Sequence, residues 1–111
     1  MNTIYTVGYG VAIKDGTPEL TPQEFDMIVE SSRPDILIDV RGGRGRALSG
    51  FGCRQIESRF PKIYQWRGAS LGNRAGNTVT QAGLDRLVSD AQHKRILMFC
   101  ACGMPYFSDG A

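Results

Sequence analysis

The sequence predicts a small Rossmann-like α/β sandwich, in which a mostly parallel sheet of about four strands is flanked by helices. Segments rich in β-branched and aromatic residues alternate along the chain with segments of helical periodicity, which is the order that a parallel sheet requires. The runs Ile36–Ile38 and Ile96–Cys100 are apolar without interruption, as in strands covered on both faces. The 111 residues suffice for one hydrophobic core, so we expect a single domain over residues 1–111.

The first half of the chain is expected to hold two strands around one helix. Ile4–Val7 forms a strand that ends in the turn Gly8-Tyr9-Gly10. The segment Thr21–Glu24 supplies a helix N-cap, a proline at the first helical position and a capping-box glutamate. Apolar residues at helical spacing follow, until Ser31–Pro34 ends the helix and Ile36–Val40 forms the second strand.

The second half of the chain continues the alternation. A short helix over Phe51–Phe60 is followed by a strand over Ile63–Trp66. The polar segment Arg67–Asn77 is expected to be a loop, and long loops inside compact domains are often functional. Thr80 caps a helix before the last strand, Ile96–Cys100. The apolar residues of that helix recur at i, i+3, i+4 and i+7, namely Leu84, Leu87, Val88 and Ala91.

Basic residues are concentrated in the middle third of the chain. Eight basic residues and one acidic residue lie from Arg41 to Arg74, a balance of +7, whereas the rest of the chain carries −5. Arginines outnumber lysines ten to three, which favours planar recognition of phosphate over a purely solubilising role. A solvated basic face is the alternative interpretation.

The predicted site is the edge of the sheet where the strands end. Right-handed crossovers gather the strand-end loops at one edge, which is where ligands bind in open parallel sheets. Arginines there would clamp an anion, glycines would let the backbone approach it, and an aromatic ring would stack on it. Asp39 is expected to be a structural anchor rather than a catalytic group. The predicted ligand-binding residues are Gly8, Tyr9, Gly10, Asp39, Arg41, Arg44, Arg46, Trp66 and Arg67.

A thiol enzyme is the alternative function. Cys53, Cys100 and Cys102 have neither disulfide spacing nor the paired spacing of a zinc site, so we expect free thiols. Cys100 or Cys102, at the end of the last strand, would be the nucleophile of a rhodanese-like or phosphatase-like site activated by nearby arginines. A cysteine that ends a buried strand is more often part of the core, so we favour binding over catalysis.

The sequence also predicts the surroundings of the protein. No apolar run approaches the ~20 residues of a membrane span, and the N-terminal segment lacks a signal peptide, so we expect a cytoplasmic protein that does not contact a membrane. No dinucleotide fingerprint or P-loop is present, and we expect neither a cofactor nor a metal. The expected partner is a small anionic ligand or a nucleotide, with a nucleic-acid end as a further option. An uncovered sheet edge would favour a homodimer.

Four short motifs resemble those of a known family. They are Ile4 to Gly10, Ile38 to Arg41, Tyr64 to Gly72 and Leu97 to Cys100, in that order along the chain. Together they resemble the YeaO-like family, domain of unknown function 488. The resemblance implies the α/β fold and no settled activity. The family's Gly-His-Ser is replaced here by Gly8-Tyr9-Gly10, and its Cys-His-Arg motif has no counterpart.

Overall fold

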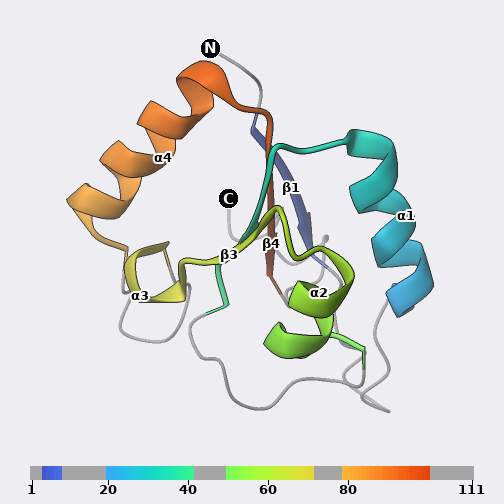
Figure 1. Cartoon of the computed structure of the whole chain (residues 1–111). Coiled ribbons are helices and arrows are strands. Elements are labelled where there is room, and N and C mark those ends of the chain that lie inside the picture. Colours follow the sequence, from blue (N-terminus) through green and yellow to red (C-terminus); the bar gives the residue numbers. More distant parts are fainter. Residues whose placement is uncertain (1–3, 9–19, 42–49, 72–78, 101–111) are drawn as a thin grey trace, which may run out of the picture.

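The computed structural model describes residues 4–8, 20–41, 50–71 and 79–100. Its strands form one four-stranded sheet, in which every neighbouring pair is parallel and the order is β1-β4-β2-β3 (Figure 1). This arrangement confirms the predicted α/β class with a parallel sheet. The strands are β1 (Ile4–Gly8), β2 (Ile36–Asp39), β3 (Tyr64–Trp66) and β4 (Ile96–Cys100).

Helices cover both faces of the sheet. α1 (Pro22–Ser32) and α2 (Cys53–Arg59) lie on one face, and α3 (Gly68–Leu71) and α4 (Gln81–His93) lie on the other (Figure 1). None of the helices in the described ranges is long and apolar enough to cross a membrane.

The hydrogen bonds at the N-terminus of α1 confirm its predicted start. The hydroxyl of Thr21 accepts a hydrogen bond from the Glu24 amide, and the Glu24 carboxylate accepts one from the Thr21 amide, which is the reciprocal capping box. Pro22 occupies the first helical position. The helix ends at Arg33, which adopts the left-handed conformation with φ 48°.

The segment predicted as a loop after β3 begins with a helix instead. Over Gly68–Leu71 the chain forms α3, in which the amides of Ser70 and Leu71 both donate to the carbonyl of Arg67. Leu71 is 6% exposed. The burial of this one large apolar side chain compensates for the weak helical propensity of Gly68 and Ser70. The remainder of the predicted loop lies outside the described residues.

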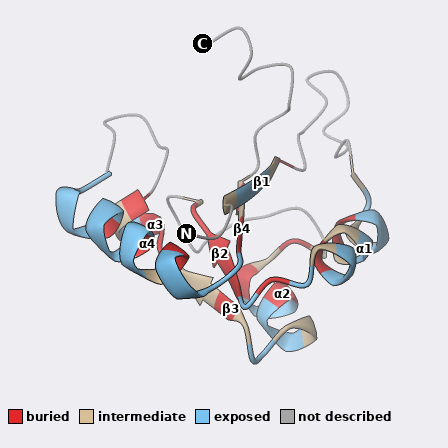
Figure 2. Cartoon of the chain, turned by 90° about the horizontal axis from the view of Figure 1, so that it is seen from above, coloured by how far each residue is buried: buried red, intermediate tan, exposed pale blue. Residues whose placement is uncertain are grey.

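Each face of the sheet has its own hydrophobic cluster. On the α1/α2 face, the ring of Phe25 packs edge-on against Phe51 and Phe99, with centroids 5.7 and 5.0 Å apart. On the α3/α4 face, Leu87 and Ala91 of α4 pack with the apolar residues of β2 and β4. Figure 2 shows α4 exposed on its outer side and β2 buried beneath the helices. Leu84 and Val88 were predicted to share that stripe but are 40% and 51% exposed.

The helices that follow β2 and β3 lie on opposite faces of the sheet. α2, the next helix after β2, lies on one face of the sheet, whereas the neighbouring strand β3 continues directly into α3 on the other face (Figure 1). Two adjacent parallel strands whose connections leave on opposite faces define the topological switch point of an open α/β sheet. In this chain the switch point lies between Asp39 and Trp66, which are paired in register.

Candidate functional site

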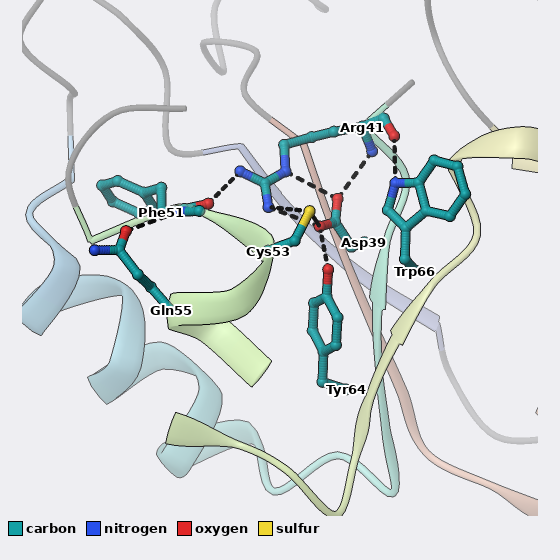
Figure 3. A network of polar contacts seen from close by, with 8 residues as sticks. Asp39, Arg41, Phe51, Cys53, Gln55, Tyr64 and Trp66 are labelled. Carbon is teal, nitrogen blue, oxygen red and sulfur yellow. Dashed lines mark hydrogen bonds and ion pairs between the residues drawn. The ribbon is translucent and has the colours of Figure 1, made fainter. Parts of the chain in front are cut away.

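The carboxylate of Asp39 is the centre of a buried polar network at the end of β2 (Figure 3). The residue is 0% exposed. Its Oδ1 accepts hydrogen bonds from the backbone amide and Nε of Arg41, at 3.0 and 2.9 Å. Its Oδ2 accepts from Arg41 Nη2 and the Tyr64 hydroxyl, both at 2.7 Å, and the Cys53 thiol lies 3.6 Å away. A buried carboxylate with this many donors is fully compensated, as expected for a structural anchor.

The guanidinium of Arg41 joins the end of β2 to the start of α2. Besides its ion pair with Asp39, it donates through Nη1 to the carbonyl of Phe51, and its Nη2 lies 3.7 Å from Cys53 Sγ. The same guanidinium stacks over the ring of Phe99, 5.1 Å from the centroid. The side chain is 10% exposed. Arg41 is therefore held by the protein itself, and its predicted role as an anion clamp stays a prediction.

Tyr64 contributes its hydroxyl from the neighbouring strand. Burial raises the pKa of this phenol well above its ordinary value, and the contacts with Cys53 and Asp39 raise it further. The phenol therefore stays protonated, as a hydrogen-bond donor to Asp39 must.

The exits of β2 and β3 are in direct contact. The Arg67 amide donates to the carbonyl of Asp39, and the indole Nε1 of Trp66 donates to the carbonyl of Arg41, both at 2.9 Å. Gly68 completes the junction. A Cβ at position 68 would lie 1.9 Å from the Arg41 carbonyl oxygen and 2.7 Å from the Trp66 ring, so only glycine allows this approach.

A second polar network lies on the α3/α4 face. Nη2 of Arg67 donates to Asp90 Oδ2 and to Gln65 Oε1, both at 2.6 Å, and Nε donates to the same amide oxygen at 3.1 Å. The Arg67 side chain is 4% exposed. Its Nη1 is buried and has no hydrogen-bond partner among residues 4–8, 20–41, 50–71 and 79–100. This ion pair also turns the Asp90 side of α4 towards β3, which explains why Leu84 and Val88 face outwards.

The predicted site residues are thus distributed over both faces of the sheet. Gly8 pairs with Cys100 in register at the ends of β1 and β4. Asp39 and Arg41 meet Trp66 on or beside the α1/α2 face, whereas Arg67 bonds on the α3/α4 face. Cys100 packs against the α3/α4 cluster. Tyr9, Gly10, Arg44, Arg46 and Cys102 lie outside the described residues.

Sequence reasoning missed several members of these networks. Cys53 was expected only to be a free thiol, and Tyr64 only to belong to a strand and a short motif, although both contact Asp39. A carboxylate in an apolar strand does signal that donors must lie nearby. It does not identify them, because Cys53 and Tyr64 are 14 and 25 residues away in the sequence. Gln65 and Asp90 bond to Arg67, but no feature of the sequence around them indicates this role.

Metal ligands do not cluster in the described part of the chain, where no group of three or more His, Cys, Asp or Glu residues comes together. Comparison with known protein families, curated proteins and solved structures finds no match to this chain. The resemblance to the YeaO-like family therefore rests on its short motifs alone.

Proposed function

We propose that this protein binds a small phosphate-bearing ligand, a nucleotide or a nucleic-acid end, at the carboxyl ends of β2 and β3. One observation carries the proposal. Directly after β3, beside the switch point, Arg67 holds a buried guanidinium nitrogen for which the described residues supply no acceptor. In open α/β sheets the switch point is where ligands bind.

The energetics of Arg67 favour an anionic acceptor. Leaving a buried donor without a partner costs about 1–3 kcal/mol, and more when the donor is charged. A phosphate oxygen would remove that cost with a charge-assisted hydrogen bond. The nitrogens Nε and Nη2 are already held by Gln65 and Asp90, so Nη1 is presented in a fixed direction. An ordered water is the competing occupant, because a single water also satisfies one buried donor.

Arg41 supports the same site indirectly. Its guanidinium is engaged with Asp39 and Phe51, and its carbonyl anchors Trp66. The junction that places Arg67 beside the end of β2 is therefore rigid before any ligand arrives, which lowers the cost of ordering a binding site. In this proposal Arg67 is the contacting arginine and Arg41 is a positioning residue.

The test is a thermal-shift titration with inorganic phosphate, mononucleotides and a 5′-phosphorylated oligonucleotide. Binding to the native state raises Tm by mass action. We expect Arg67→Lys to weaken the shift-derived affinity by roughly tenfold to a hundredfold, because a contact worth about 1.5–3 kcal/mol is lost. Arg54→Gln is the matched control, since Arg54 belongs to the same basic block but is exposed on α2.

Each variant is compared with its own ligand-free Tm, so a change in intrinsic stability does not obscure the result. Equal ligand-induced shifts in wild type and Arg67→Lys would contradict the proposal, as would no shift with any of these anions at millimolar concentration. A loss in Arg54→Gln together with an unchanged shift in Arg67→Lys would indicate diffuse attraction to the basic surface instead, because only the first substitution removes a positive charge.

A thiol-dependent enzyme is the second candidate, and one contact favours it. Cys53 Sγ lies 3.7 Å from Arg41 Nη2, which is the arginine neighbour that a reactive thiol needs. Cys53 is, however, only 7% exposed, so a substrate has little access to its sulfur. Binding is therefore the better-supported function. Loss of a measured enzymatic activity in Cys53→Ser or Cys100→Ser would instead favour the thiol-dependent enzyme over the binding protein.

A further inference from the structure

The two edge strands of the sheet differ in their protection against pairing. β3 has three residues, and Pro61 and Lys62 come shortly before it. Short length, proline and lysine are the usual means of blocking an edge. β1 has five residues, Ile4–Gly8, and contains neither a charge nor a proline. Within the described ranges β1 pairs with β4 alone, so its outer edge lacks a strand partner there.

The side chains of β1 are also unusually accessible for a strand. Tyr5 is 40% exposed, Thr6 is exposed, and Ile4 and Val7 are half-buried. β2, in contrast, is buried along its whole length (Figure 2). β-branched and aromatic residues on an accessible edge are the composition that favours strand addition.

We propose that two copies of this chain associate through antiparallel pairing of their β1 strands about a two-fold axis at Thr6. This alignment places Thr6 opposite Thr6 of the second copy and Tyr5 opposite Val7 in both directions. Aromatic to β-branched pairs and threonine pairs are among the stabilising cross-strand neighbours. Because β1 contains no charged residue, this pairing brings no like charges together. The two sheets join into one continuous sheet.

The faces of the strand exclude a register shifted by one residue. Val7 packs with the α1/α2 cluster and Ile4 with the α3/α4 cluster, so Tyr5 and Val7 share the first face. Pairing Tyr5 with Val7 therefore puts α1 of both copies on the same side of the joined sheet. A register one residue away would pair Tyr5 with Thr6 and place the two α1 helices on opposite sides. An isologous interface of this kind needs the same surface from both partners, which a single strand supplies.

The expected dimer is weak and reversible. A pair of five-residue strands buries less than the roughly 1,200 Å² of a stable interface, so the dimer fraction should rise with protein concentration. β1 and β3 are the opposite edges of the sheet. Dimerisation is accordingly independent of the ligand site proposed at β2 and β3.

Light scattering during size-exclusion chromatography at several concentrations tests the proposal with Thr6→Lys, Thr6→Glu and their equimolar mixture. Each variant alone places like charges opposite each other, so we expect dimerisation to weaken by roughly tenfold. The mixture should restore a heterodimer, because lysine then faces glutamate. Met27→Lys on α1, where Met27 is 65% exposed, adds the same charge away from the edge and should leave the dimer intact.

Three outcomes would overturn this interface. They are a monomer at every concentration, a dimer that both Thr6 variants retain, and weakening in both variants without recovery on mixing. Circular dichroism of each variant shows whether it is folded, and an unfolded variant cannot be rescued by its oppositely charged counterpart.

Discussion

The indole Nε1 of Trp66 donates a hydrogen bond to the carbonyl of Arg41 over 2.9 Å. This contact joins the exits of two neighbouring strands whose connections leave on opposite faces of the sheet. Trp66 is the only tryptophan of the chain. Its fluorescence therefore reports directly on the junction between β2 and β3.

Replacement of Gly68 by alanine should open this junction. The new Cβ would lie 1.9 Å from the Arg41 carbonyl oxygen and 2.7 Å from the indole ring, so backbone or ring must move. Overpacking of this kind costs about 1–3 kcal/mol, and more when the obstructing atom is backbone. We expect a lower free energy of unfolding in urea and a shifted Trp66 emission in the folded state.

Gly52→Ala is the control for that experiment. Its Cβ would meet only the end of the flexible Gln55 side chain, at 3.2 Å. The expected cost is below about 1 kcal/mol, with unchanged tryptophan emission. Equal destabilisation by both substitutions would show that the close approach at Gly68 is not the cause.

Asp39→Asn should be strongly destabilising. The substitution preserves shape but removes the charge that compensates Arg41, whose side chain is 10% exposed. Breaking a buried ion pair by removing one partner costs about 3–5 kcal/mol. Asp26→Asn is the matched control, because its ion pair with Arg59 is more exposed, at 24% and 29%, and should contribute at most about 1 kcal/mol. Urea denaturation of both variants measures the difference, and similar losses would refute the anchoring role of Asp39.

Tyr64 should make the protein lose stability in alkali. Its pKa is raised in the folded state by burial and by its contacts with Cys53 and Asp39. The folded state therefore holds the phenolic proton more tightly than the unfolded chain, whose tyrosines titrate near pH 10. The stabilisation that the protonated Tyr64 phenol gives the folded state is complete below pH 10. It is lost as the pH rises above 10, at up to ~1.4 kcal/mol per pH unit.

Tyr64→Phe isolates that contribution from the other groups that titrate in alkali. The variant loses the hydrogen bond to Asp39 and should be less stable than wild type at neutral pH by about 1–3 kcal/mol. Above pH 10 the difference should shrink, because the variant has no phenol to ionise when unfolded. Unfolding free energies measured from pH 8 to 11 decide the matter, and a constant difference would contradict the raised pKa.

Cys53 should resist alkylation in the folded protein. Its side chain is buried and donates towards Asp39, and the thiolate is the form that reacts. Treatment with iodoacetamide near neutral pH, followed by mass spectrometry, should leave Cys53 unmodified until denaturant is added. Rapid labelling of Cys53 in buffer alone would instead favour the thiol-enzyme alternative.

The sequence was informative wherever a local signal was strong. Thr21 to Glu24 identified the start of α1, and the apolar runs at Ile36 and Ile96 identified strands covered on both faces. α3 was missed because Gly68 to Leu71 lacks capping and periodicity, and it is held by the burial of Leu71. Such tertiary stabilisation is invisible in a window of a few residues.

The candidate site was predictable only in part. The switch point follows from strand order, and periodicity does not reveal that β4 lies between β1 and β2. Asp39 was expected to be a structural anchor, and in the structure its carboxylate forms an ion pair with Arg41. The cluster of arginines suggested a shared surface, yet Arg41 and Arg67 bond on opposite faces. Successive side chains along a strand point to opposite faces of the sheet. The face on which an arginine near a strand end lies therefore cannot be assigned from the sequence until the exact end of the strand is known.

The position of β4 has a consequence for synthesis on the ribosome. β1 has β4 as its only partner in the described sheet, and β4 also forms one side of β2. Residues 4–8 therefore cannot enter the sheet until residues 96–100 have left the exit tunnel. A nascent chain that pauses earlier leaves β1 unpaired and one edge of β2 uncovered, which is the condition that recruits chaperones or leads to aggregation.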